Sequence, residues 1–220
     1  MPTTKTPSSR RSRKALLVID VQNDFIPGGA LAVPGGDQIV PLINRLGGHF
    51  KQVVIAQDWH PAGHISFASS HEGHAPNDII QLPYGPQVLW PDHCVQASRG
   101  AELHPKLNLP HAQLILRKGC NPDIDSYSAF VEADRSTTTG LAGYLSQRGI
   151  DTVYLVGLAL DYCVAWSALD ARAAGFNTFV IVDACRAIDM DGSLDKATRQ
   201  MRATGVNLIK ASELQPTALC

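Results

Sequence analysis

The sequence predicts a single α/β domain in which a parallel β-sheet carries helices on both faces. Its 220 residues, 45% of them apolar, are enough to bury one sizeable core. Six short apolar runs recur along the chain, and helical patterns separate several of them. Most of these runs are continuous rather than alternating, which is typical of strands buried on both faces. The alternation of strands and helices favours a doubly wound, six-stranded parallel sheet.

Each apolar run has the length of one strand. In chain order the expected strands are Ala15–Val21, Val53–Gln57, Gln113–Arg117, Thr152–Leu158, Thr178–Val182 and Val206–Ile209.

Four helices are expected to cover this sheet. Asp37 is expected to cap the first, whose apolar residues run from Ile39 to Leu46 before a Gly-Gly pair. The second covers residues 138–148, the third covers 162–174 with Asp161 as its cap, and the fourth covers 193–204. A glycine follows each of the last three, as is common where helices end.

The two ends of the chain differ in character. Residues 1–14 hold five basic residues and no acidic one, together with Pro and Ser, and we expect a disordered basic tail. A transit peptide is the alternative, although Pro2 and Pro7 disfavour the amphipathic helix that it would need. Residues 15–220 are expected to form the folded domain.

Charge and composition exclude several classes of function. The net charge is −1, so nothing draws the whole chain to nucleic acid or to an anionic membrane. No apolar run reaches the roughly 18–20 residues that span a bilayer, and no signal-peptide core precedes residue 15. Five cysteines, an odd number, argue against a disulfide scaffold and favour the reducing cytoplasm. The sequence leaves open whether the chain forms a homo-oligomer.

Reactive side chains follow four of the expected strands. Asp20 ends the first, Asp58 and His60 follow the second, Lys118 follows the third, and Cys163 follows the fourth. In open α/β sheets ligands bind beyond the carboxyl ends of the strands, so these groups are expected to converge on one edge.

Cys163 is the candidate nucleophile of this group. A helix start and a nearby Lys118 would both lower its pKa and favour the thiolate. Asp20 could take its proton, and backbone N–H groups of the turn before it could form an oxyanion hole. The alternative is that Cys163 is a small buried hydrophobe, because free cysteines are often buried.

The pair Asp58 and His60 predicts a metal site. In an extended segment the two side chains point to the same side and could hold a divalent ion with a third ligand. Segment 60–111 is rich in His, Pro and Gly with little periodicity, and His93 within it is the preferred third ligand. His64, His71 and His74 stay open as alternatives, and Cys94 is expected to be structural although it could coordinate.

Aromatic residues near these loops could enclose a flat ring. Phe25 and Trp90 are the candidates, with core packing as the alternative. Three other cysteines, Cys120, Cys185 and Cys220, are expected to have no function.

Several segments together resemble the nicotinamidase/pyrazinamidase family of isochorismatase-like cysteine hydrolases. The resemblance covers nearly all of residues 15–212. It is carried by ALLVIDVQNDFIPGGALAV from Ala15, QDWHPAGHISF from Gln57, LWPDHCV from Leu89, RKGCNPDIDSYSAF from Arg117 and VGLALDYCV from Val156.

The resemblance implies a mechanism and a set of site residues. It implies that nicotinamide, or pyrazinamide, is hydrolysed to its acid and ammonia through a cysteine thioester, as a step of NAD salvage. The implied catalytic residues are Asp20, Lys118 and Cys163, with the backbone of Ala159 and Cys163 as oxyanion hole. The implied metal ligands are Asp58, His60 and His93, with Ser66 acting through water. The implied pocket residues are Phe25, Trp90, Tyr127 and Ala159, and Leu158–Ala159 matches a cis peptide bond of the family.

Two rival functions stay open from the sequence. A metal-free relative acting on isochorismate or a carbamoyl amide would not need Asp58, His60 and His93. A binding module without activity would not need Asp20, Lys118 and Cys163. Zinc, iron and manganese all suit Asp and His ligands.

Overall fold

The computed structural model describes residues 13–214. The expected basic tail therefore lies outside the described residues up to position 12, and so does Cys220. Lys14, expected at the end of that tail, instead begins the first strand. None of the helices in residues 13–214 has the length and apolar character needed to cross a membrane.

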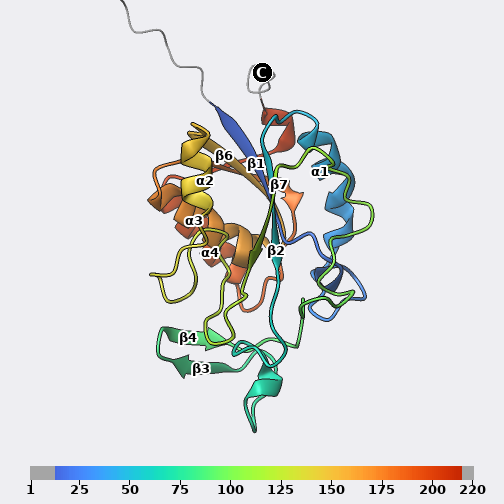
Figure 1. Ribbon diagram of the computed structural model, residues 1–220, viewed down its shortest axis with the longest axis vertical. Helices are drawn as coiled ribbons and strands as arrows, with labels where there is room; N and C mark the ends of the chain where they lie inside the picture. Colours follow the sequence, from blue (N-terminus) through green and yellow to red (C-terminus); the bar gives the residue numbers. More distant parts are fainter. Residues whose placement is uncertain (1–12, 215–220) are drawn as a thin grey trace, which may run out of the picture.

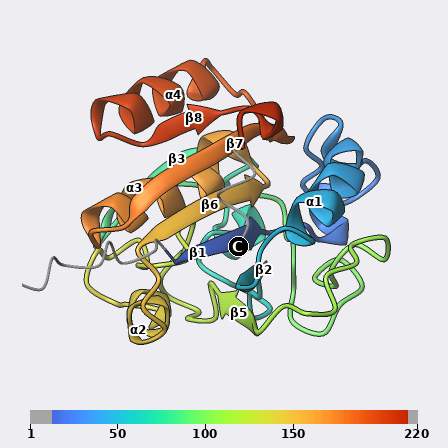
Figure 2. The ribbon, with the colours of Figure 1, turned by 90° about the horizontal axis from the view of Figure 1, so that it is seen from above.

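A six-stranded, wholly parallel sheet forms the centre of the molecule, and this confirms the predicted fold class (Figure 2). Its strand order is β5-β2-β1-β6-β7-β8. The strands are β1 (Lys14–Ile19), β2 (Val53–Asp58), β5 (Leu114–Lys118), β6 (Thr152–Gly157), β7 (Asn177–Cys185) and β8 (Asn207–Ile209). All six coincide with the predicted apolar runs, each of which has the length of a single strand. The order reverses between β1 and β6, where such sheets bind their ligands.

Helices cover both faces of the sheet, also as predicted (Figure 1). One face packs against α1 (Val40–Gly47), and the other packs against α2 (Leu141–Gln147), α3 (Ala165–Ala173) and α4 (Ser193–Ala203). Successive residues of β1 alternate between the faces: Leu16 and Val18 pack with the α1 side, and Leu17 and Ile19 with the other. Because both faces of β1 are buried, its residues after Lys14 form a continuous apolar run.

Both expected aspartate caps are wrong. Asp37 lies inside η2 (Gly36–Ile39), a 3₁₀ turn, and α1 then starts without a side-chain cap. Asp161 lies inside η4 (Leu160–Val164), a π-helical turn that leads into α3. Its carboxylate accepts hydrogen bonds from the backbone of Ile188 (3.1 Å) and Asp189 (2.8 Å) instead. A tertiary contact with the loop after β7 therefore replaces the local cap.

Segment 60–111 is more ordered than its composition indicates. It contains an antiparallel hairpin of β3 (Ile79–Leu82) and β4 (Gly85–Val88), which the sequence did not predict. The strand pattern of this short hairpin is hard to recognise in the sequence because it contains Pro83 and Pro86, and proline is unusual in strands. Single bridges join His60 to Val95 and Phe67 to Trp90, and they hold the segment over the carboxyl edge of the sheet.

Candidate active site

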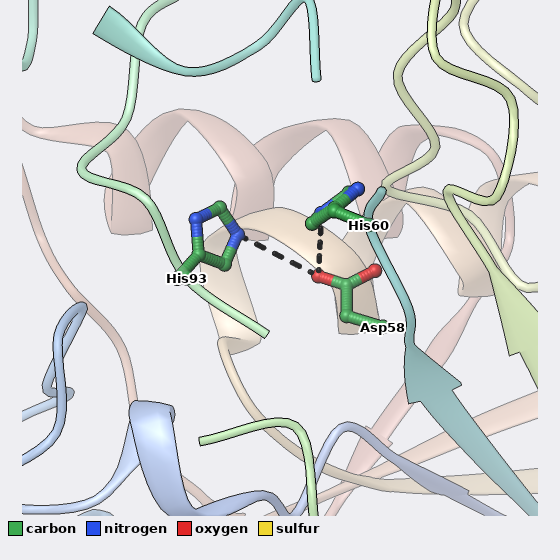
Figure 3. A group of neighbouring side chains, drawn as sticks. All are labelled: Asp58, His60 and His93. Carbon is green, nitrogen blue, oxygen red and sulfur yellow. Dashed lines mark ion pairs between the residues drawn. The ribbon is translucent and has the colours of Figure 1, made fainter. Parts of the chain in front are cut away.

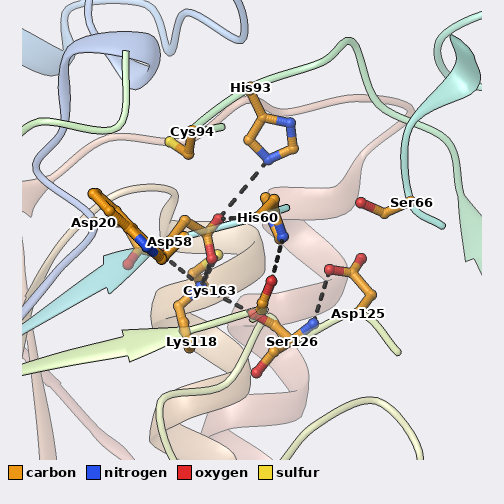
Figure 4. Close-up of polar contacts among 12 residues, drawn as sticks. Asp20, Asp58, His60, Ser66, His93, Cys94, Lys118, Asp125, Ser126 and Cys163 are labelled. Carbon is orange, nitrogen blue, oxygen red and sulfur yellow. Dashed lines mark hydrogen bonds and ion pairs between the residues drawn. The ribbon is translucent and has the colours of Figure 1, made fainter. Parts of the chain in front are cut away.

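Four reactive side chains from four strand ends meet at the carboxyl edge of the sheet (Figure 4). Asp20 follows β1, Asp58 ends β2, Lys118 ends β5 and Cys163 lies in η4 after β6. Asp58 and Lys118 are directly paired in the register of β2 and β5. All four are buried. The convergence follows from the parallel sheet, because strands that run the same way end at the same edge.

Lys118 is the centre of this group. Its Nζ lies 2.6 Å from Asp58 Oδ1, 2.9 Å from Asp20 Oδ2 and 3.5 Å from Cys163 Sγ. It also donates a hydrogen bond of 2.9 Å to the carbonyl of Ser126. The contact with Asp20 is an ion pair outside hydrogen-bond geometry, since neither oxygen of Asp20 has a hydrogen-bond partner among the described residues. One buried ammonium thus compensates two buried carboxylates.

Burial and these charges set the protonation states. Burial raises the pKa of Asp20 to about 6, although Lys118 opposes the rise. Burial alone would also raise the pKa of Asp58, but Lys118 and His60 hold it well below its usual range. For Lys118, burial works against the proton, but the attraction of Asp20 and Asp58 raises its pKa well above the ordinary value. At neutral pH the group therefore contains a charged Lys118 and an ionised Asp58.

The expectation of a lowered pKa for Cys163 is wrong. Burial raises the pKa of its thiol well above the ordinary value and outweighs the opposing effect of Lys118. The sulfur also lies in a π-helical turn rather than at a capped helix start. A thiol that is neutral at rest needs a base, and a carboxylate oxygen of Asp20 lies within 4.8 Å of Sγ.

Asp58, His60 and His93 form a second group beside the first (Figure 3). Oδ2 of Asp58 lies 3.5 Å from His60 Nε2 and 3.8 Å from His93 Nε2. The two Nδ1 atoms donate to backbone carbonyls, from His60 to Gly119 (2.9 Å) and from His93 to Pro91 (2.8 Å). When the rings are neutral, each Nε2 therefore has a lone pair on the side of the carboxylate, where a metal ligand needs it. Carbonyl-anchored imidazoles and one carboxylate fit a divalent metal ion.

At His93, a proton does not compete strongly with a metal ion for the imidazole nitrogen. Burial, with His60 as the next cause, lowers the pKa of His93 to about 4, so the ring is neutral at pH 7. For His60, burial disfavours the proton, but the attraction of Asp58 outweighs it and raises the pKa. A divalent cation would take the place of that proton between His60 and Asp58.

The other loop histidines have partners of their own. His64 Nδ1 accepts hydrogen bonds from the hydroxyl (2.8 Å) and the N–H (3.2 Å) of Ser66. His71 donates to the carbonyl of Ile65, and His74 contacts Asp78. Among the described residues, His93 forms a group with Asp58 and His60 whose ligand atoms lie within 4.8 Å of one another, and none of these three histidines joins that group, which favours His93 as the third ligand. The water-mediated role of Ser66 stays a prediction.

A pocket opens onto both groups. Its wall contains the four residues expected from the resemblance and also Cys163, Asp58, His60 and His93; the expected four are Phe25, Trp90, Tyr127 and Ala159. Trp90 donates a hydrogen bond of 2.9 Å to the hydroxyl of Tyr127. The aromatic and aliphatic side chains of the pocket, with a few polar groups beside them, suit a small flat ring.

Sequence reasoning missed several pocket residues, of which Asp125 is the most polar. Asp125 is buried and accepts hydrogen bonds from Gln87 Nε2 (2.7 Å) and from the N–H of Ser126 (2.8 Å). With His60 and His64 it forms a further group whose ligand atoms lie within 4.8 Å. It is one of several acidic residues after Lys118, and no spacing singles it out. The other missed wall residues are Leu31, Tyr162 and Ile188.

The turn after β6 has the backbone that the resemblance implies. The Leu158–Ala159 peptide bond is cis. The N–H of Leu160 donates to Arg186, and those of Tyr162 and Val164 donate to Ala159. These three N–H groups are therefore not available to a ligand. The oxyanion hole of Ala159 and Cys163 stays a prediction.

Comparisons with known proteins agree with this architecture. The isochorismatase domain model matches residues 14–213. The chain is 65% identical to the nicotinamidase of Acinetobacter baylyi over 200 residues, which cover 91% of this chain and 94% of that protein. A solved nicotinamidase/pyrazinamidase of Acinetobacter baumanii matches with a TM-score of 0.92 and 57% identity, covering 94% of this chain and all of the other (100%). A pyrazinamidase of Pyrococcus horikoshii in complex with zinc matches with a TM-score of 0.74 and 36% identity, covering 90% and 99%. The chain therefore belongs to the isochorismatase family, in the nicotinamidase/pyrazinamidase group that its motifs resemble.

Proposed function

We propose that this chain is a metal-dependent cysteine amidohydrolase that converts nicotinamide to nicotinate and ammonia, and pyrazinamide to its acid, in NAD salvage. The observation that carries the proposal is the contact of Lys118 with both Asp20 and Cys163 beneath a pocket whose wall also contains Asp58, His60 and His93. Acyl transfer at a carboxamide needs a nucleophile, a base and a polarised substrate, and these residues supply them. The names of the relatives support nicotinamide as the substrate.

The acyl-transfer half of the reaction belongs to Asp20, Lys118 and Cys163. Asp20 takes the proton of the Cys163 thiol, and the sulfur attacks the carboxamide carbon while the N–H groups of Ala159 and Cys163 stabilise the oxyanion. Asp20 then returns the proton to the nitrogen, the C–N bond breaks, and ammonia leaves a thioester on Cys163. Water activated by Asp20 hydrolyses the thioester to the carboxylate and restores the thiol. Lys118 stays protonated throughout and compensates the charge on Asp20 and on the sulfur.

The substrate-binding half belongs to the pocket and the metal ligands. Phe25 and Trp90 enclose the flat ring, with Tyr127 beside them. Asp58, His60 and His93 would hold the divalent ion, which supplies Lewis-acid chemistry when bound. Zinc, iron and manganese all suit these donors, and zinc is the first ion to test because the solved Pyrococcus relative contains it.

The proposal also covers the binding partners and the cellular location of the enzyme. We infer a small-molecule substrate, a cytoplasmic location and no nucleic-acid or membrane partner, from the balanced charge and the few cysteines. The domain extent of 15–220 and a homo-oligomer stay predictions.

Ammonia release tests the proposal directly. The full chain is incubated with nicotinamide, pyrazinamide or a carbamoyl amide, each without metal and with added zinc, iron or manganese, and ammonia is measured. We expect release from the two aromatic amides, and we expect a chelator to abolish it. Release from the carbamoyl amide alone, unaffected by the chelator, would favour the metal-free relative. No release from any amide with zinc, iron or manganese would favour a binding module.

A further inference from the structure

Gln22 is a fully buried side chain that the mechanism does not use. It does not line the pocket, and it contacts none of the proposed metal-ligating side-chain atoms. Its amide instead contacts the backbone of Asp58 twice: Nε2 donates to the Asp58 carbonyl, and Oε1 accepts from the Asp58 N–H, both at 2.8 Å. The second hydrogen of Nε2 goes to the carbonyl of Ala101 at 2.9 Å. The amide has therefore one orientation, because the reverse would set its oxygen against two carbonyls.

These two contacts replace a strand that ends too early. Strand β1 leaves the sheet at Asp20, which has a φ of 50°, whereas β2 continues to Asp58. On the side of β2 that faces β1, the carbonyl of Ala56 still accepts from the N–H of Asp20 at 3.1 Å. The backbone groups of Asp58, two residues on, point to the same side and find no further residue of β1. The amide of Gln22 takes the place of the missing peptide group.

The position of Asp58 depends on this replacement. Its two carboxylate oxygens serve the two halves of the site, Oδ1 toward Lys118 at 2.6 Å and Oδ2 toward His60 and His93. On the other side of β2, the N–H of Trp59 donates to the carbonyl of Lys118 at 2.9 Å. With Gln22 in place, the end of β2 is hydrogen-bonded on both sides. Without it, two buried backbone groups of Asp58 would lack partners, and the strand end would shift to find others.

We propose that Gln22 is a positioning residue for the metal site, because its amide continues the β1–β2 ladder and fixes the backbone of Asp58. This inference rests on the proposed function, since it takes Asp58, His60 and His93 as the ligands. Partners that orient a metal ligand from outside the coordination shell typically change metal affinity 10–100-fold when they are lost.

The test is zinc binding by Gln22→Met, which keeps the length of the side chain and removes its hydrogen bonds. The matched control is Gln57→Met. Gln57 is also buried and donates to the same Ala101 carbonyl, at 2.8 Å, but its amide does not contact Asp58. Zinc dissociation constants are measured on the full chain by competition with a chromogenic chelator, and thermal unfolding of the zinc-free proteins is followed by circular dichroism.

We expect the dissociation constant to rise about 10–100-fold in Gln22→Met and to change less than about threefold in Gln57→Met, because the side-chain amide removed there does not hold the Asp58 backbone. Wild-type affinity in Gln22→Met, or an equal loss in both variants, would overturn the inference. If Gln22→Met does not fold, Gln22→Glu replaces it, because it keeps the acceptor for the Asp58 N–H and removes both donors, and the same loss is expected. His60→Ala is measured alongside: if it binds zinc like the wild type, the ligand assignment of the proposed function fails, and this inference fails with it.

Discussion

The two halves of the site are held in place in different ways. Asp20, Lys118 and Cys163 come from strand ends and the turn after β6, and they are joined to one another through the ammonium of Lys118. His60 and His93 lie in the long segment after β2, and each is fixed by a backbone carbonyl at its Nδ1. Only Asp58 takes part in both halves.

This difference follows from where each side chain is carried. The sheet fixes the backbone of a residue at a strand end, so its buried charged side chain needs only an opposite charge nearby. A residue on a loop has no such frame, so hydrogen bonds to the backbone must orient it. A substitution in one half should therefore leave the other half intact: loss of the acyl-transfer half should lower ammonia release, and loss of the metal ligands should lower zinc affinity. The predictions below test this separation, from the largest expected effect to the smallest.

Cys163→Ala should lose activity and keep the metal. Ammonia release should fall by about 10⁴-fold or more, because removing a nucleophile stops the covalent route. Zinc content, measured by elemental analysis, should equal that of the wild type, since the sulfur does not hold His60 or His93. Substantial residual activity would rule out the covalent route, and loss of zinc would show that the halves are not separate.

Lys118→Met should unfold more easily as well as lose activity. It leaves Asp20 and Asp58 buried without compensation, which costs about 3–5 kcal/mol when one partner of a buried ion pair is removed. The free energy of unfolding is measured with urea. Lys106→Met is the matched control, because Lys106 is exposed, and it should change stability by no more than about 0.5 kcal/mol. Equal stability of the two variants would refute the central role of Lys118.

Gly119→Ala should weaken metal binding and leave Asp20, Lys118 and Cys163 in place. Gly119 has a φ of +66°, and a Cβ there would lie 2.4 Å from Cε1 of His60. The ring would have to leave its carbonyl anchor, and zinc affinity should fall about 10–100-fold. Gly73→Ala is the control, because Gly73 has a φ of +80° and open space around it, so it carries the same backbone cost without the contact. Equal zinc affinity in the two variants would contradict the anchoring of His60.

The pH dependence of kcat/KM should reflect the acyl-transfer half, through the protonation of Asp20. Burial raises the pKa of Asp20 to about 6, and only the ionised carboxylate can accept the thiol proton. With zinc kept saturating, kcat/KM should therefore be constant above pH 6 and fall about tenfold per pH unit below it, as Asp20 becomes protonated. A profile that stays flat down to pH 5 would mean that Asp20 is not the base.

The sheet, and the meeting of four candidate site residues at its carboxyl edge, could be predicted from the sequence. Short apolar runs predicted the strands, and parallel strands bring their carboxyl ends to one edge, so Asp20, Asp58, Lys118 and Cys163 had to be neighbours once the fold was right. The spacing of Asp58 and His60 placed both side chains on the same side of an extended segment. These inferences succeeded because they depend on periodicity, which is a local property of the chain.

Tertiary contacts decided the rest. Asp161 looked like a helix cap but bonds the loop after β7, and Cys163 looked activated but is buried so deeply that its thiol is neutral. Gln22 gave no signal in the sequence, because its amide matters only where β1 ends beside a longer β2. The sequence by itself determined which elements form and which reactive groups share an edge, since these follow from local patterns. Only the tertiary structure decided protonation, anchoring and the partner of each polar group, because these depend on burial and on residues distant along the chain.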